Sequence, residues 1–121
     1  SQFKVDQDQV EAFYLDEFSY VLYIILKEKT LLIVNFNKAN LRDITVFFLL
    51  SLFPLTAHSL GHQLLDLSNE IFSGDKVINI RYIQENESLV IVTENGEIFQ
   101  VKPSSGSVQP LSITLSLTKS H

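Results

Sequence analysis

Four short β-type segments follow one another in the C-terminal half of the chain, with a turn signal between each pair. The strongest signal is Asn95-Gly96, two residues that tolerate the positive φ angles of a type I′ hairpin turn. Four short strands joined by tight turns make one propeller blade. We therefore predict a blade-like antiparallel meander over residues 77–117, a scaffold that carries no chemistry of its own. Its strands are expected at Val77–Ile83, Ser88–Thr93, Glu97–Lys102 and Val108–Thr114.

A second region near the N-terminus has the same layout. Tyr14-Leu15-Asp16-Glu17 aligns with Tyr82-Ile83-Gln84-Glu85. In each case, a long apolar strand follows at nearly the same number of residues. Similarity at a fixed spacing is the mark of a structural repeat. We predict a first blade-like meander over residues 10–37, and the alternative is two unrelated hairpins in one antiparallel sheet. The strands are expected at Val10–Leu15, Ser19–Leu26 and Thr30–Phe36, with a solvated turn at Lys27-Glu28-Lys29.

Residues 38–76 fit the repeat less well. Ile44–Leu55 is almost unbroken apolar sequence, but it is shorter than the roughly 20 residues that a membrane-spanning helix needs. We therefore predict no membrane span. In order of preference, this apolar insertion is a buried strand, a core helix that ends before Pro54, or a segment in contact with a membrane or partner. Periodicity does not separate these alternatives for a short run.

The second half of that region has helical spacing. Apolar residues at 60, 64, 67 and 71 would share one face of a short helix over residues 56–72. Thr56 is a suitable N-cap, and Ser73-Gly74 would end the helix. If the repeat is strict, Gln63–Leu67 is instead the strand that enters the second blade, and residues 39–62 are an insertion.

Composition restricts the partners. The net charge of −5, without a cluster of basic residues, argues against direct contact with nucleic acid, which needs a basic patch. Cysteine is absent, which excludes disulfides and thiolate zinc sites and favours the cytoplasm. A hydrophobic content of 45% with a mean hydropathy of +0.17 indicates surfaces that neighbouring blades or subunits would cover. We expect protein partners, and self-association of the isolated chain.

Two histidines are the best candidates for metal ligands. His58 and His62 lie four residues apart and would share a face of the predicted helix, a spacing that zinc sites use. Such a site needs a third ligand, which Asp66 or Glu70 would supply only along an unbroken helix. We expect packing or surface roles for both histidines, and we predict no metal site.

Sequence motifs for catalysis are also missing. The four glycines have neither phosphate-loop nor dinucleotide-binding spacing, and there is no nucleophile elbow. Asp16, Glu85 and Glu87 lie at predicted turns, where solvated carboxylates are the rule, although a pair such as Glu85 and Glu87 could do acid–base work. We predict no catalytic and no cofactor-binding residue, and therefore no enzyme. A hydrolase that uses His58 or His62 with a turn carboxylate is the least favoured alternative.

Residues 74–98 resemble the early blades of the N-terminal WD-type propeller in the largest Elongator subunit. The resemblance is carried by Tyr82-Ile83, Glu87-Ser88-Leu89, Val92-Thr93 and Gly96-Glu97-Ile98, and residues 13–36 resemble the blade before it. The resemblance implies a scaffold in a cytoplasmic assembly that modifies wobble uridines in transfer RNA, with catalysis on a different subunit. It transfers no functional residue to this chain, because the propeller turns have no catalytic motif to match.

These patterns together predict one mainly β unit, residues 1–121, with two blade-like antiparallel β-meanders of a β-propeller, acting as a non-catalytic scaffold or protein-interaction module. The alternative is a small α+β domain, in which one helix packs on an antiparallel sheet and the domain binds a partner or an apolar ligand. Its cavity would be lined by Phe47, Phe48, Phe53 and Phe72. In the favoured fold, the strand faces expected to be buried carry Val21, Tyr23, Ile25, Val90, Val92, Phe99 and Val101.

Overall fold

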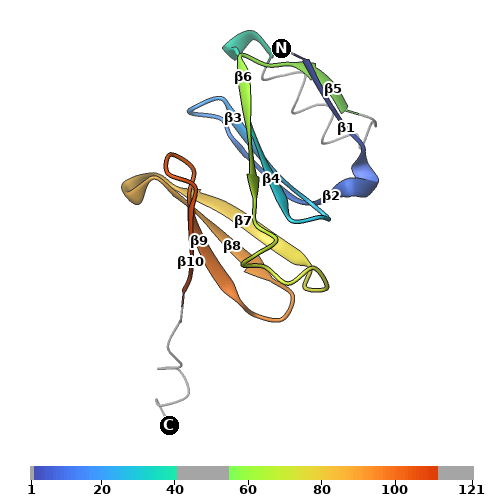
Figure 1. Ribbon diagram of the computed structural model, residues 1–121. Coiled ribbons are helices and arrows are strands. Elements are labelled where there is room, and N and C mark those ends of the chain that lie inside the picture. Colours follow the sequence, from blue (N-terminus) through green and yellow to red (C-terminus); the bar gives the residue numbers. More distant parts are fainter. Residues whose placement is uncertain (1, 41–54, 112–121) are drawn as a thin grey trace.

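The protein is mainly β (Figure 1). The computed structural model describes residues 2–40 and 55–111. Within these ranges, the chain forms two four-stranded antiparallel sheets, one two-stranded sheet and three short 3₁₀ helices. None of the described helices is long and apolar enough to cross a membrane.

Each large sheet is a meander of four antiparallel strands. Sheet 1 has the strand order β2-β3-β4-β6, and sheet 2 has the order β7-β8-β9-β10. Sheet 1 comprises β2 (Val10–Asp16), β3 (Val21–Leu26), β4 (Thr30–Asn35) and β6 (Gly61–Asp66). Sheet 2 comprises β7 (Val77–Ile83), β8 (Ser88–Thr93), β9 (Ile98–Lys102) and β10 (Ser107–Pro110). The remaining elements are the paired strands β1 (Gln2–Val5) and β5 (Leu55–His58), and the helices η1 (Gln7–Gln9), η2 (Lys38–Asn40) and η3 (Gln84–Asn86).

The strands predicted for both meanders are confirmed within the described residues, but one turn type is not. The last predicted strand, Val108–Thr114, ends at Pro110 in the structure, and its residues 112–114 lie outside the described residues. A type I′ turn at Asn95-Gly96 would need positive φ at both residues, and only Gly96 has it, with φ of 87°. The N–H of Gly96 donates to the carbonyl of Thr93 at 2.9 Å. The hairpin therefore uses a longer connection, which ends with glycine in the left-handed region.

The helix predicted over residues 56–72 is wrong, because this region forms β5 and β6. β6 pairs with β4 and completes sheet 1. The apolar spacing does not mark one buried face, since Leu64 is 59% exposed whereas Leu67 is fully buried. The alternative strand at Gln63–Leu67 is closer to the structure, but it ends the first sheet and does not enter the second.

The α+β alternative is wrong for the same reason, since the described residues contain only 3₁₀ helices of three residues each. Phe72, one of the four phenylalanines assigned to an apolar cavity, is 73% exposed. The other three, Phe47, Phe48 and Phe53, lie outside the described residues, as does the apolar insertion up to Pro54.

Sheet 2 repeats three strands of sheet 1 at a constant spacing of 67 residues. β2 begins at Val10 and β7 at Val77, while β3 begins at Val21 and β8 at Ser88. Both β2 and β7 have a bulge next to their first residue. The chain therefore contains two copies of one unit, as the sequence predicts.

The backbone of the turns follows the same spacing. Positive φ recurs at Tyr20 and Glu87, and again at Lys29 and Gly96. The sequence alignment of Tyr14 with Tyr82 implies a spacing of 68 and is one residue out of register. A shift of one residue in a strand moves every side chain to the opposite face, so the register decides how the two sheets pack.

The two sheets stack front to back. The core that they share takes Ile25 from β3, whereas Ile24 lies in a second core on the opposite side of sheet 1. In β8, however, Ile91 enters the shared core, and Ile91 is the equivalent of Ile24. Likewise, Leu22 lies in the second core, whereas its equivalent Leu89 lies in the shared core. Two repeats packed face to face would bring equivalent residues into one core, so the two sheets are instead packed front to back.

The prediction for the buried face of β8 is wrong by one residue. Leu89 and Ile91 are fully buried in the shared core, whereas Val90 and Val92 are half-buried on the other side. The run from 89 to 92 is apolar throughout, so alternation does not indicate which side is covered. The remaining predictions of burial are confirmed, for Val21, Tyr23, Ile25, Phe99 and Val101.

Sheet 2 has one face that points away from sheet 1. At the 67-residue spacing, this face is the equivalent of the face of sheet 1 that packs against sheet 2. The strand register places Val90 opposite Gln100 and Val92 opposite Ile98. These three apolar residues are half-buried and belong to neither of the hydrophobic cores formed by the described residues. We call this surface the open face, and it consists of Asn79, Arg81, Val90, Val92, Ile98 and Gln100.

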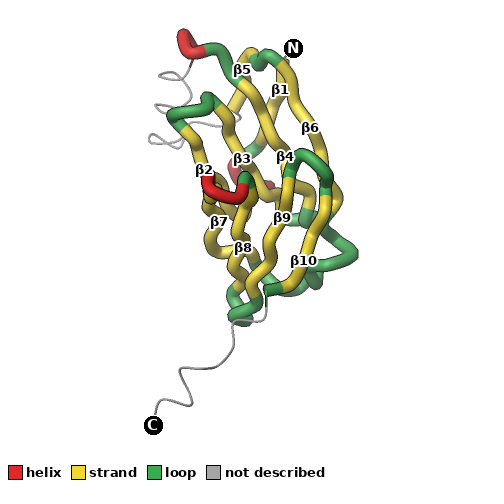
Figure 2. Tube along the Cα trace, turned by 90° about the vertical axis from the view of Figure 1, so that its left-hand side faces the viewer, coloured by secondary structure: helices red, strands yellow, loops and turns green. Residues whose placement is uncertain are grey.

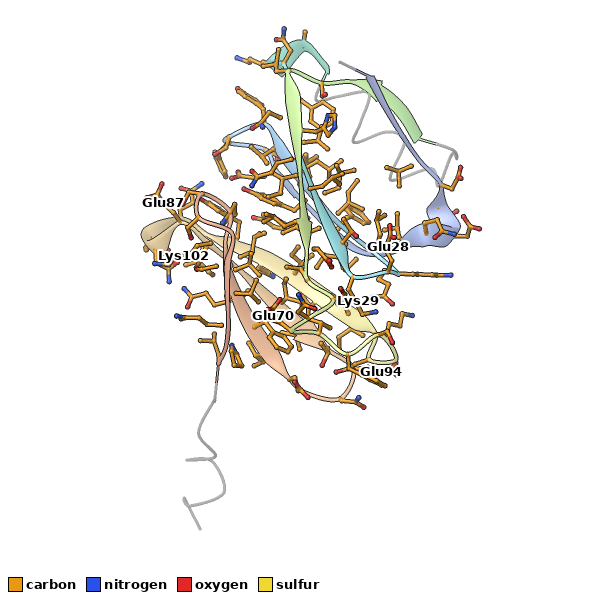
Figure 3. All side chains as sticks on the ribbon, viewed as in Figure 1. Glu28, Lys29, Glu70, Glu87, Glu94 and Lys102 are labelled. Atoms are coloured by element: carbon orange, nitrogen blue, oxygen red, sulfur yellow. The ribbon has the colours of Figure 1, made fainter. Side chains whose placement is uncertain are left out.

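A buried ion pair joins the two sheets at one end of their interface, where Figure 3 labels Lys29. Lys29 is fully buried, and its Nζ donates to Glu11 Oε1 at 2.8 Å. Nζ also donates to the carbonyls of Lys27 at 3.3 Å and Ser73 at 3.4 Å. Glu11 Oε1 accepts the N–H of Val77, the first residue of β7, at 3.2 Å. The solvated turn predicted here is therefore wrong for Lys29, because a carboxylate from β2 compensates its buried charge.

Removal of one member of this ion pair should destabilise the fold strongly. Glu11→Ala leaves the ammonium with two carbonyl acceptors and removes the acceptor of the Val77 N–H. We expect the free energy of unfolding to fall by about 3–5 kcal/mol. The double variant Glu11→Gln/Lys29→Met removes both charges and keeps an amide acceptor, so it should lose less than Glu11→Ala. Urea unfolding followed by circular dichroism measures both losses.

Glu28→Gln is the matched control, because Glu28 lies in the same turn and is exposed. Its free energy of unfolding should stay within about 0.5 kcal/mol of the parent value. A loss below about 1 kcal/mol for Glu11→Ala is what an exposed pair would give, and it would contradict a structural role for the ion pair.

Candidate functional site

A hollow of about 370 Å³ lies at the other end of the interface between the sheets. One wall comes from the end of β2 and the turn after it, and the other comes from the end of β7 and from η3. Both walls lie on the left-hand side of Figure 1, the side that Figure 2 faces. β2 and β7 both start near the ion pair and end here, so they run in the same direction. The lining residues are Tyr14, Asp16, Phe18, Tyr82, Ile83, Gln84 and Glu85.

Asp16 supplies a buried carboxylate to this hollow. It is the last residue of β2 and is only 3% exposed. Oδ1 accepts the N–H of Phe18 at 3.0 Å and that of Ser19 at 3.3 Å, which fixes the turn. Oδ2 is buried and has no hydrogen-bond partner among the described residues. A buried polar atom without a partner is unfavourable, so Oδ2 is the acceptor that a ligand would satisfy.

Three tyrosines stack across the interface beside this carboxylate. The ring of Tyr23 stacks on that of Tyr14, with centroids 6.4 Å apart, and on that of Tyr82, with centroids 5.5 Å apart and planes at 11°. Burial raises the pKa of Tyr23, and Tyr82, Asp16 and Tyr14 raise it further. Burial also raises the pKa of Tyr82, with smaller contributions from Glu87 and Asp16. Both phenols therefore keep their protons at neutral pH.

The mouth of the hollow is aromatic and acidic. Phe18, in the turn after β2, is 87% exposed, and Glu85, in η3, is also exposed. None of the described residues that line the hollow is basic. Carboxylates attract positive charge, and the faces of aromatic rings do the same. In chemical terms, the hollow is an environment for a cation.

The two candidate metal ligands do not come together on one helix. His58 lies in β5 and His62 lies in β6, and these strands belong to different sheets. The shared helical face predicted for them is therefore wrong. His62, Asp66 and Glu70 are exposed. Across residues 2–40 and 55–111, no group of three or more His, Cys, Asp or Glu side chains is placed to hold a metal ion.

The carboxylates predicted to be solvated at turns have different environments. Glu85 and Glu87 are exposed, although Glu85 also lines the hollow. Asp16 is buried, so the solvated-turn prediction is wrong for it. A signal for its role exists in the sequence, because Asp at the end of a strand commonly accepts the N–H groups of the next two or three residues. That signal indicates the bond to Oδ1, but not the burial of Oδ2.

Comparison with protein-family models, with curated proteins and with solved structures found no match. The chemistry of the hollow is therefore inferred from its own residues. A buried carboxylate oxygen, stacked phenol rings and an acidic mouth suit the reversible binding of a positively charged group.

The raised pKa of Tyr23 predicts a loss of stability in alkaline solution. In the unfolded chain, the hydroxyl ionises near its ordinary pKa of 10.0, whereas the folded chain holds this proton to higher pH. The stabilising contribution is therefore fully present below the unfolded value, and it is lost as the pH rises towards the folded value. Tyr23→Phe removes the ionisable group and should make this loss smaller. Urea unfolding of both chains, at about pH 8 and at about pH 11, measures the difference.

The comparison uses the change in unfolding free energy between the two pH values within each chain. Any effect of Tyr23→Phe on packing is the same at both pH values, so it cancels. An alkaline loss as large in Tyr23→Phe as in the parent chain would show that Tyr23 is not held protonated by its surroundings.

Proposed function

We propose that this chain is a non-catalytic scaffold and protein-interaction module of a multi-subunit assembly. Its two units stack like successive blades, and such stacking continues from sheet to sheet until each face is covered. The chain would contribute two sheets to this stack and position the proteins that bind to it. Any chemistry of the assembly would belong to another subunit, so no enzymatic activity is assigned to this chain.

The open face is the observation that supports this proposal. At the 67-residue spacing, Val90 is the equivalent of Tyr23, and Val92 is the equivalent of Ile25. Tyr23 and Ile25 are buried in the core that the sheets share, whereas Val90 and Val92 are half-buried on the open face. The second unit thus leaves on the open face the positions that the first unit buries between the sheets. An apolar sheet face of this kind is typical of an interaction surface.

The open face has the anatomy of an interface between separately folded proteins. Val90, Val92 and Ile98 are its apolar part, whereas Asn79 and Arg81 are exposed polar residues on β7. An apolar centre with a polar rim is typical of such interfaces. Covering the centre would contribute about 25 cal/mol for each Å² of apolar surface removed from water. The net charge of −5 favours a protein over a nucleic acid as the direct partner.

The resemblance to Elongator propeller blades gives the proposed assembly a specific form. It implies a cytoplasmic complex that modifies wobble uridines in transfer RNA, in which this chain would hold neighbouring subunits in place. Residues 74–98, which carry the resemblance, include β7 and β8 and reach the first residue of β9. These are the strands that build the open face, so the resemblance and the proposed interaction surface fall on one segment.

Self-association of the isolated chain should depend on the open face. We expect the parent chain to form larger species as its concentration rises, because an apolar sheet face without a partner pairs with another copy. Val92→Lys places a charge within the apolar part of this face and should raise the dissociation constant at least about tenfold. Size-exclusion chromatography with light scattering measures association, and far-ultraviolet circular dichroism verifies that the strands are intact.

Asn69→Lys is the matched control, because it adds the same charge in the exposed segment between β6 and β7. This variant should associate like the parent chain. Equal association of Val92→Lys and the parent, or a parent chain that stays monomeric at every concentration, would overturn the interaction role of the open face.

A further inference from the structure

The hollow between the sheets contains a buried acceptor that the scaffold role does not explain. One oxygen of Asp16 is held by the turn, through the N–H groups of Phe18 and Ser19. The other oxygen, Oδ2, is buried and has no partner among the described residues, and the Asp16 side chain lines the hollow. A buried carboxylate is stabilised by a positive charge that donates hydrogen bonds to it. A ligand that completed this site would therefore be a cationic donor.

Flat aromatic surfaces accompany this acceptor. Tyr14 and Tyr82 line the hollow from different sheets, and each stacks on Tyr23, which holds its ring in place. Phe18 contributes a third ring, at the exposed mouth. Aromatic faces bind planar cations by stacking and by cation–π attraction. The walls of the hollow thus favour a flat cation over a compact one.

A second source of negative charge lies on the wall that sheet 2 provides. Glu85 in η3 lines the hollow, and Glu87 follows directly after η3. Figure 3 shows Glu87 at the left-hand edge of the molecule, on the side where the hollow lies. The charge of Glu87 contributes to the raised pKa of Tyr82, so it acts on one of the aromatic walls. Negative charge on both sheets would hold a cation at their junction.

We propose that this hollow binds the guanidinium group of an arginine side chain from a partner protein. The inference rests on the proposed scaffold role, because it supplies a specific anchor for such a partner. A guanidinium group is planar and has five N–H donors, so it can stack on a tyrosine ring while it donates to Asp16 Oδ2 and to Glu85. The volume of about 370 Å³ lies within the range of ligand pockets and accommodates a side chain of this size.

Titration of the full 121-residue chain with N-acetyl-arginine amide tests this assignment. Nuclear magnetic resonance with ¹⁵N-labelled protein should show saturable shifts of the Asp16, Phe18 and Glu85 amides, with a dissociation constant in the millimolar range. The citrulline counterpart is the neutral control, because its urea group has the same shape without the charge. The lysine counterpart tests shape, because its ammonium is charged but not planar.

Two pairs of variants assign the binding to individual groups. Asp16→Asn keeps an oxygen for the Phe18 and Ser19 N–H groups but removes the charge, and it should weaken arginine binding at least about tenfold. Asp8→Asn, an exposed substitution in η1, should leave binding unchanged. Tyr82→Leu should weaken binding because it removes a ring face, whereas Tyr82→Phe should retain it.

The proposal is overturned if no saturable binding is seen, if citrulline or lysine binds as tightly as arginine, or if Asp16→Asn binds like the parent chain. The test is separable from that of the scaffold role. Val92→Lys lies on the open face and should leave arginine binding unchanged, while Asp16→Asn should leave self-association unchanged. Failure of the arginine site is therefore distinguishable from failure of the open face.

Discussion

The core between the two sheets joins the front of one repeat to the back of the next. Ile25 of sheet 1 and Ile91 of sheet 2 share this core, although they are not equivalent positions of the repeat. Two sheets packed in this way leave an outer face on each, because every sheet buries one face and presents another. The second core on the outer side of sheet 1 and the open face of sheet 2 are both consequences of this order. The proposed scaffold role follows from the same constraint.

The same interface is organised differently at its two ends. At the starts of β2 and β7, Glu11 Oε1 accepts from both Lys29 Nζ and the N–H of Val77, so the charge of this carboxylate is compensated. At the ends of these strands, Asp16 Oδ1 accepts two backbone N–H groups, whereas Oδ2 has no partner among the described residues. A hollow lies here between the two sheets. A compensated charge stabilises the stack, whereas an uncompensated one provides a binding site. Stability and recognition are therefore placed at opposite ends of one junction.

The sequence predicts the strands and the repeat well, because both depend on local signals such as alternation, Gly96 and the polar turns. It predicts poorly which face of a strand is buried. The run from Leu89 to Val92 is apolar on both faces, and only the tertiary register shows that Ile91 is covered while Val92 is not. The local sequence also does not show which charges compensate one another across a long separation in the chain. Lys29 looks like a turn lysine until Glu11, 18 residues earlier, is placed beside it.

Chemical labelling of single cysteines tests the front-to-back stacking most directly, because the chain contains no cysteine of its own. Ile91→Cys and Val92→Cys place a thiol on either side of the same strand, and the rate of reaction with a thiol reagent reports which side is covered. Front-to-back stacking predicts that Val92→Cys reacts in the folded state, while Ile91→Cys reacts at least about a hundredfold more slowly, because the buried thiol reacts only after opening of the core. Equal rates, or faster reaction of Ile91→Cys, would contradict the stacking and the open face with it.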